Sequence, residues 1–248
     1  MPNSIKDYRS LVEKPWGRMF YDMIYNQLDL PNDKQLNILD FGSGFCVTAN
    51  HYAKNHNVTA VEPSSDMLNI RIKENEFTLM NGGIEIVKDM PSNSFDLVIC
   101  HNVLEYVSDR EMIIKELTRV LKQNGKLSIV KHNLAGRIFA YAVFGDNPES
   151  ALDLLSKNND NEANMFGSRD TYSNEDLIRY CSCLGLNVGS IYGIRTFFAL
   201  STNDDIKYTA EWYNNMLELE MKACNIDEYK NIAFFNHLIF TKDGEVLQ

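Results

Sequence analysis

The sequence of 248 residues lacks several features that define common protein classes. Its five cysteines are scattered, none forms a CxxC pair, and the five histidines do not cluster with them, so we predict no disulfide framework and no metal site. No apolar run approaches the ~20 residues that cross a bilayer. The opening residues MPNSIKDYRS lack the apolar core of a secretory signal. We therefore expect a cytoplasmic protein without a membrane partner.

Positive charge is also scarce. The chain has 24 Lys and Arg against 34 Asp and Glu, which gives a formal net charge of −10. This balance disfavours non-specific binding to nucleic acid, although a local basic cleft is compatible with it. The hydrophobic share of 44% is ordinary for a folded protein. The length suits one large domain, which we expect to span residues 1–248.

Short apolar runs alternate with amphipathic segments after residue 35. This alternation predicts an α/β fold with a doubly wound, Rossmann-like sheet that is mostly parallel and ends in an antiparallel strand. Strands are expected at 36–41, 58–62, 83–87, 95–102, 126–132, 186–198 and 232–242, and helices at 15–28, 46–55, 64–75, 110–123, 173–185 and about 204–223.

Residues 133–172 interrupt this rhythm after the fifth predicted strand. They combine an apolar half with a polar half, and they follow the carboxyl end of a strand. Long insertions at that edge of a sheet commonly form lids or substrate caps. We therefore expect a helical cap insertion here.

The segment LDFGSGFC (39–46) follows a predicted strand and opens a predicted helix. Gly42 and Gly44 allow a tight turn and a close approach of the backbone to a ligand. The segment is not a GxGxxG fingerprint, because Val47 occupies the third glycine position, and it has no P-loop lysine. Glu62 ends the next strand, where a carboxylate can accept the hydroxyls of a ribose. The pattern predicts a nucleoside-binding turn.

Three segments carry a resemblance to a known family: ILDFGSG, VTAVEPSSDML and SFDLVICHNVLEYVSD. Together they resemble the class I S-adenosylmethionine-dependent methyltransferases over roughly residues 36–132. In that family the glycine loop wraps the methionine part of the cofactor, the acid holds the ribose, and residues after the third strand cover the adenine. The resemblance implies an enzyme that uses S-adenosylmethionine, with cofactor-binding residues Asp40, Gly42, Ser43, Gly44, Glu62, Val87 and Asp89.

One position departs from this family pattern. Many members carry a third glycine in the loop where this chain has Cys46. A small side chain is expected to be tolerated there. A helix N-terminus lowers thiol pKa values, which makes Cys46 a candidate for a lowered pKa, but we interpret it as a structural residue.

A narrower resemblance extends over nearly the whole chain. The segments HNVLEYVSD, KHNLAGRIFAYAVFG, GIRTFF, LELE and NHLIFTK are similar to bacterial tRNA 5-carboxymethoxyuridine methyltransferases, which esterify the carboxylate of a modified wobble uridine. By this resemblance Arg18 binds the cofactor, and the N-terminal helical segment 1–30 covers it. His101 is implied to be a further cofactor-site residue. An arginine can clamp a carboxylate with two parallel hydrogen bonds.

The catalytic candidates are His101, His132 and Arg195. Arg195 lies in the GIR segment, where a fixed cation can hold a carboxylate substrate. A carboxylate acceptor is already nucleophilic at neutral pH and needs no general base. A hydroxyl or amine acceptor would need one, and His101 and His132 are the bases to test.

The acceptor stays open between tRNA and a small molecule. Residues 141–180 hold eight acidic and three basic residues. A cap that handles tRNA is expected to contact phosphates through several lysines and arginines, so this charge favours a small metabolite. Two other functions remain as alternatives, namely a nicotinamide-dependent oxidoreductase and a non-catalytic S-adenosylmethionine-binding protein. The missing third glycine disfavours the oxidoreductase.

Overall fold

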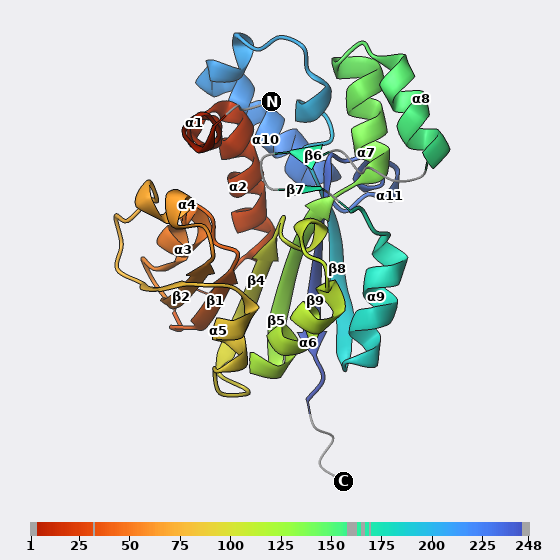
Figure 1. Cartoon of the computed structure of the whole chain (residues 1–248). Coiled ribbons are helices and arrows are strands. Elements are labelled where there is room, and N and C mark those ends of the chain that lie inside the picture. The colour runs from red at the N-terminus through yellow and green to blue at the C-terminus, as the bar shows by residue number, and fades with distance from the viewer. Residues whose placement is uncertain (1–3, 32, 158–162, 165–166, 169, 245–248) are drawn as a thin grey trace. The chain divides into compact units, whose positions relative to one another are not determined.

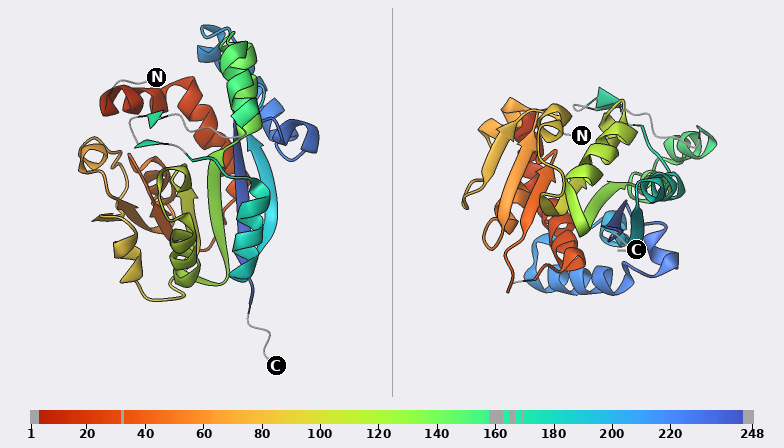
Figure 2. Two further views of the ribbon diagram at one scale, coloured as in Figure 1. Left: turned by 45° about the vertical axis from the view of Figure 1, so that its right-hand side comes forward. Right: turned by 90° about the horizontal axis from the view of Figure 1, so that it is seen from below.

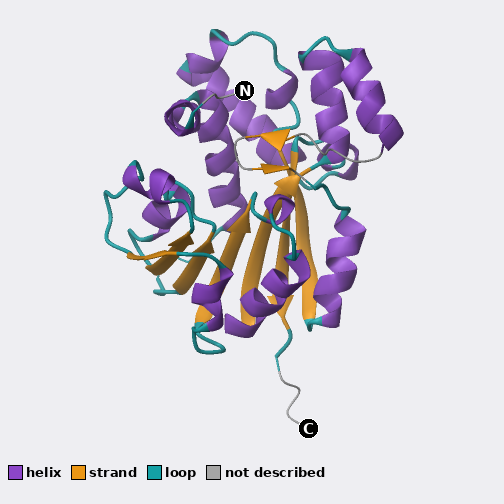
Figure 3. Cartoon of the chain, viewed as in Figure 1, coloured by secondary structure: helices purple, strands orange, loops and turns teal. Residues whose placement is uncertain are grey.

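The computed structural model describes residues 4–31, 33–157, 163–164, 167–168 and 170–244 (Figure 1). A seven-stranded sheet has the order β3-β2-β1-β4-β5-β9-β8 and is mostly parallel, with antiparallel pairing beyond β5 (Figure 3). Its strands are β1 (Asn37–Phe41), β2 (Asn57–Glu62), β3 (Thr78–Asn81), β4 (Phe95–His101), β5 (Leu121–His132), β8 (Leu186–Ile194) and β9 (Phe235–Lys242). The predicted Rossmann-like α/β fold is confirmed.

The helices alternate with these strands through most of the chain. They are α1 (Ile5–Glu13), α2 (Pro15–Leu28), α3 (Val47–Tyr52), α4 (Ser65–Asn69), α5 (Ile84–Lys88), α6 (Arg110–Val120), α7 (Leu134–Phe139), α8 (Pro148–Lys157), α9 (Asn174–Cys183), α10 (Ala210–Ala223) and α11 (Asp227–Lys230). A short strand pair, β6 (Ala163–Asn164) and β7 (Gly167–Ser168), forms a separate sheet. Among the described residues, no helix is both long and apolar enough to cross a membrane.

The chain divides into two compact units. The first comprises Met1–Leu30, Val130–Thr171 and Ile191–His237, and the second comprises Pro31–Ile129, Tyr172–Ser190 and Leu238–Gln248. In the first unit α7 and α8 pack against each other, as Figures 1 and 2 show, so the predicted cap segment is helical at 134–139 and 148–157, and it also contains the short strands β6 and β7. Its role as a cap stays a prediction. The second unit contains the glycine loop and the strands β1 to β4.

Local sequence explains the two helices that open the first unit. Ser4 caps α1 by accepting a hydrogen bond from the Asp7 backbone N–H at 3.1 Å. Pro15 occupies the first turn of α2, where its missing N–H costs nothing. Met19, Met23 and other apolar residues of α2 recur at helical spacing and are fully buried. The helix predicted at 15–28 is confirmed.

The predicted strand at 83–87 is wrong. Residues 78–81 form β3 and pair in parallel with β2, while Ile84–Lys88 is the helix α5. The alternating apolar residues of GIEIV fit either a strand or one short helical turn, and length alone does not decide between them. Gly83 decides it locally, because its N–H donates to the Glu85 carboxylate at 2.6 Å at the start of the helix.

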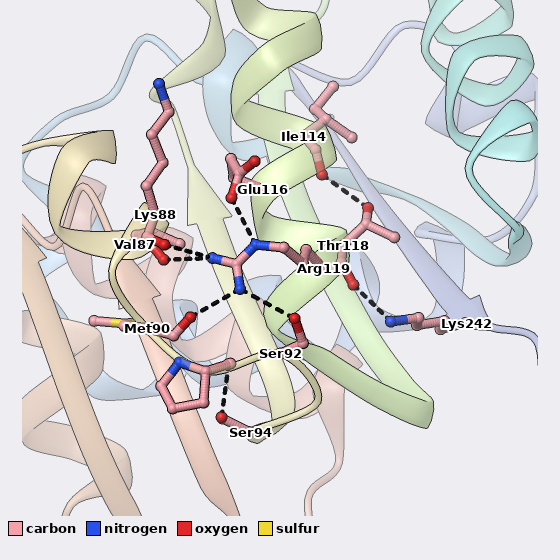
Figure 4. A network of polar contacts seen from close by, with 11 residues as sticks. Val87, Lys88, Met90, Ser92, Ser94, Ile114, Glu116, Thr118, Arg119 and Lys242 are labelled. Atoms are coloured by element: carbon pink, nitrogen blue, oxygen red, sulfur yellow. Dashed lines mark hydrogen bonds and ion pairs between the residues drawn. The ribbon is translucent and has the colours of Figure 1, made fainter.

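The end of the helix predicted at 110–123 also moves. α6 ends at Val120, β5 begins at Leu121, and Gly125 lies within β5 rather than at the helix end. The guanidinium of Arg119 ties this junction to the end of α5, donating to the carbonyls of Val87 at 2.8 Å and Met90 at 2.8 Å (Figure 4). These bonds connect the C-terminal end of α5 to the end of α6.

Candidate cofactor site

The parallel register of β1, β2, β3 and β4 places the carboxyl ends of these strands side by side. The residues at these ends are Gly42, Glu62, Asn81 and His101. Phe41 pairs with Val61, so Gly42 and Glu62 leave the sheet together. Glu62 in turn pairs with Asn81 at the end of β3. The chain order reverses between β1 and β4, and open α/β sheets bind ligands at such a switch point, outside the carboxyl ends of the strands.

The glycine loop is a left-handed turn held against the end of β2. Gly42 and Gly44 have φ values of +72° and +55°. The N–H groups of Gly42 and Ser43 both donate to the carbonyl of Val61, at 2.8 and 3.1 Å. A Cβ atom on Gly42 would lie 2.3 Å from a Val103 methyl carbon. Glycine is therefore required there both for conformation and for space.

Cys46 occupies the third position of this loop, in a backbone conformation that favours glycine. Its φ of +58° is left-handed, and it is the N-cap residue of α3. The side chain is fully buried. Burial raises the pKa of the Cys46 thiol to about 11, partly opposed by a hydrogen bond with Ser43. The lowered pKa expected from the helix N-terminus is therefore wrong, because desolvation of the thiolate dominates.

Glu62 fixes the glycine loop with both of its carboxylate oxygens. Oε2 accepts a hydrogen bond from the Gly44 N–H at 2.8 Å, and Oε1 accepts one from the Ser64 N–H at 2.8 Å. The side chain is only 6% exposed. Each carboxylate oxygen has a second lone pair, so the group can accept further hydrogen bonds from a diol. The sequence anticipated an acid at this position but not its role in shaping the turn.

Asp40 is a second buried carboxylate in the same region. Burial is the main cause that raises its pKa to about 7; a hydrogen bond from the Ala49 N–H opposes the increase, and the charge of Glu62 adds to it. Within the described ranges, its Oδ2 atom has no hydrogen-bond partner. A cationic ligand beside this turn is favoured, because a nearby positive charge stabilises the ionised form of a buried carboxyl such as Asp40.

Val87 and Asp89 lie at the C-terminal end of the helix α5 rather than at the end of a strand, and Val87 is fully buried. Their role in covering the adenine stays a prediction. The residues that leave the carboxyl end of β3 are Asn81, Gly82 and Gly83. Asn81 Nδ2 donates to the Glu62 carbonyl at 2.8 Å. The Asn-Gly-Gly sequence, a typical turn signal, marked this position.

His101 ends β4 and is held by a neighbour on β5. Its Nε2 atom lies 2.7 Å from the Ser128 hydroxyl oxygen. Asp40 pairs with Ile99 across β1 and β4, so His101 and Gly42 leave adjacent strands at the same level. A role for His101 in the cofactor site stays a prediction.

The remaining predicted residues belong to the first unit. Arg18 is exposed on α2, with its guanidinium carbon 4.5 Å from the centre of the Tyr213 ring. The Tyr213 hydroxyl donates to Asp22 at 2.6 Å, which fixes the ring. The proposed contact of Arg18 with the cofactor stays a prediction.

Arg195 and His132 both contact the rings of Phe234 and Phe235. The guanidinium carbon of Arg195 lies 5.0 Å from the centre of the Phe234 ring and 5.1 Å from that of Phe235. His132 lies 4.7 Å from Phe235, ring centre to ring centre. The side chain of Arg195 is 1% exposed, so it is an enclosed cation rather than a surface one.

Sequence reasoning missed the function of Glu220, in the LELE segment. Its carboxylate accepts three backbone hydrogen bonds, from the N–H groups of Thr196 at 2.9 Å and of Phe197 and Phe198 at 2.8 Å. It thereby fixes the chain just after Arg195. A Glu that repeats in an otherwise amphipathic helix gave no local signal for this long-range contact.

Comparison with known proteins agrees with this geometry. Residues 39–129 match the methyltransferase domain family. A ubiquinone biosynthesis O-methyltransferase of Xanthomonas oryzae is 30% identical over 130 residues, which are 50% of this chain and 53% of the relative. The match thus spans about half the length of that relative. The Coxiella burnetii enzyme of the same name is 26% identical over 189 residues, covering 71% of this chain and 76% of its own.

Solved structures show the same fold. A methyltransferase of Archaeoglobus fulgidus, described as dependent on S-adenosylmethionine, superposes with a TM-score of 0.61 at 15% identity, covering 95% of this chain and 99% of its own. The fold is the Rossmann-like fold of class I methyltransferases. The domain family and this fold imply S-adenosylmethionine as the cofactor.

The residues of the second unit fit that cofactor. Glu62 has acceptor capacity for a ribose diol, and Asp40 offers an Oδ2 atom that has no hydrogen-bond partner among the described residues. S-adenosylmethionine carries a sulfonium and an ammonium, and a positive charge beside a buried acid such as Asp40 favours its ionised form.

Proposed function

We propose that this protein transfers the methyl group of S-adenosylmethionine to an oxygen nucleophile of a small-molecule acceptor. The single observation that carries the proposal is the Glu62 carboxylate, which fixes the left-handed glycine turn from the end of β2. A buried acid in that position suits a ribose, and the second acid, Asp40, suits a ligand with positive charge. The fold and the domain match support the same reaction class.

When bound, S-adenosylmethionine supplies an electrophilic methyl group for an in-line displacement. The chain then has to orient the acceptor and exclude water. Glu62 would hold the ribose while keeping the turn closed. Ser128 holds the His101 ring at the end of β4, where it can accept a proton from a hydroxyl acceptor. A carboxylate acceptor would need no such base.

A small molecule is favoured as the acceptor by charge. Residues 141–180 include eight acidic and three basic residues, and a tRNA phosphate backbone would be repelled by that excess. The relatives named ubiquinone biosynthesis O-methyltransferase support an oxygen acceptor. The second candidate is the carboxylate of a modified wobble uridine in tRNA. The GIRTFF and LELE segments support it, and Glu220 of LELE accepts hydrogen bonds from the N–H groups of Thr196 and Phe197 in GIRTFF.

The test is transfer of labelled methyl groups from S-adenosylmethionine by the purified full chain. Small-molecule fractions and total tRNA of the source cell serve as separate acceptors. Label in a small molecule supports the proposal, and base-labile label identifies a methyl ester. Label in tRNA alone supports the second candidate. Binding of S-adenosylmethionine without transfer to either fraction would contradict both and favour a non-catalytic binding protein.

A further inference from the structure

Arg195 is a buried charge without an ionic partner among the residues that the structure describes. It is 1% exposed, and its Nη1 atom makes one long hydrogen bond, to the Trp16 carbonyl at 3.3 Å. In the part of the chain that the structure describes, its Nε atom has no partner and no carboxylate forms an ion pair with it. Burial lowers the pKa of Arg195 to about 9, so the group still carries its charge at neutral pH.

Three aromatic rings enclose this guanidinium. Its central carbon lies 4.2 Å from the centre of the Trp16 ring. The centres of the Phe234 and Phe235 rings are farther from this carbon, at 5.0 and 5.1 Å. We call Arg195, Trp16, Phe234 and Phe235 the arginine cradle. Cation–π contacts recover part of the desolvation cost, but they leave the in-plane N–H donors unused.

The acid that acts on this charge does not pair with it directly. Glu220 attracts Arg195 electrostatically. Its two oxygens, however, accept the N–H groups of Thr196, Phe197 and Phe198. Arg195 itself has a left-handed φ of +59°, a conformation that is costly outside glycine. The fold thus holds a charged side chain in place at a cost in stability, which is typical of functional sites.

We propose that the arginine cradle is a binding site for a planar carboxylate, which the Nε edge of Arg195 receives once the Trp16 ring moves aside. Side-on binding to a guanidinium edge gives a carboxylate two parallel hydrogen bonds. Trp16 is 38% exposed, whereas Phe235 is 3% exposed and Phe234 is of intermediate exposure, so Trp16 is the most exposed wall and the one that we expect to open. The aromatic walls favour a flat, conjugated acid over a tetrahedral anion.

The proposal also names a substrate class. Resting on the proposed function, it names an aromatic or unsaturated acid as the class of methyl acceptor. His132 contacts Phe235, so a ligand in the cradle would lie beside a second polar group of the same unit.

The test uses tryptophan fluorescence of the full chain without S-adenosylmethionine. The sequence has two tryptophans, so Trp212→Phe leaves Trp16 as the only reporter. We expect benzoate to change its emission in a saturable way and the neutral isostere benzamide to have no such effect. An equal response to both compounds, or none to benzoate, overturns the proposal.

Variants separate binding from folding. Arg195→Met keeps much of the length of the side chain and removes an unpaired charge, so it should raise the melting temperature while abolishing the benzoate response. Arg195→Lys should weaken benzoate at least tenfold, because a lysine has no planar fork. Arg179→Gln, an exposed arginine paired with Asp176, is the charge-matched control and should leave the response unchanged. A purely structural arginine would instead give a lower melting temperature in Arg195→Met.

The proposed function is measured separately, by calorimetry with S-adenosylmethionine. Cofactor binding without a benzoate response overturns only the cradle. A benzoate response in a chain that does not bind the cofactor overturns only the proposed function.

Discussion

The glycine loop and the arginine cradle are two enclosed regions with opposite electrostatic problems. Around the loop, Asp40 is buried with an oxygen atom that has no hydrogen-bond partner among the described residues. In the cradle, Arg195 is buried without an ion pair in that same part of the chain. Each region lacks the charge that the other has in excess. A ligand cation complements the first and a ligand anion the second, so the sign of the missing charge indicates what each region binds.

The largest expected effect comes from replacing Asp40. Its Oδ2 atom has no hydrogen-bond partner among the described residues. The pKa of Asp40 is raised to about 7 in the folded protein, whereas its ordinary value of 3.8 applies to the unfolded chain. Its stabilising contribution is therefore present below pH ~4 and is lost as pH rises through 7. We measure the effect of Asp40→Asn as the free energy of unfolding of the variant minus that of the unmodified protein. This effect should be about 4 kcal/mol more favourable at pH 8 than at pH 4.

Denaturant unfolding at the two pH values measures this difference. Asp89→Asn is the control, since Asp89 is exposed at the end of α5. If the gain in the Asp40→Asn variant did not depend on pH, burial would not be holding Asp40 in its protonated form.

The second largest effect tests the acid that does have partners. Glu62→Gln removes the negative charge and one of the acceptors for Gly44 or Ser64. Charge-assisted hydrogen bonds contribute ~2–3 kcal/mol, so S-adenosylmethionine should bind about 100-fold more weakly. Calorimetry measures this, and Glu111→Gln on the exposed side of α6 is the control. An unchanged affinity would leave the cofactor site without its central residue.

These two acids also show how far sequence reasoning reached. Gly42 and Glu62 were predictable because a turn after a strand and an acid after the next strand meet at one edge by parallel pairing alone. The third strand was predicted at 83–87 rather than at 78–81 because GIEIV fits a strand and a short helix equally well. The enclosure of Arg195 was not predictable. It depends on Trp16, which lies 179 residues away in the sequence, and no local pattern reports such a contact.

A smaller effect is expected from the exposed arginine of the first unit. Arg18 sits over the Tyr213 ring, where its donors can reach a carboxylate. If it clamps the methionine carboxylate, Arg18→Ala should weaken S-adenosylmethionine about tenfold, or ~1.4 kcal/mol. Tyr213→Phe keeps the ring and should change the affinity little, whereas Tyr213→Leu should reproduce part of the loss. Equal affinity of Arg18→Ala and the unmodified protein would show that Arg18 takes no part in cofactor binding.

The smallest effect concerns a cost that the two regions share. Cys46 and Arg195 both hold left-handed backbone conformations, with φ values of +58° and +59°, although neither is glycine. At position 46 the side chain is small, so the backbone term can be isolated by comparing two variants. Cys46→Gly relieves the left-handed strain and Cys46→Ala retains it, while both remove the sulfur. We expect the glycine variant to be more stable by about 1 kcal/mol in denaturant unfolding. In an unstrained element, a glycine variant would be less stable than an alanine variant. If Cys46→Ala were as stable as Cys46→Gly or more stable, position 46 would store no strain. The comparison with Arg195 would then fail.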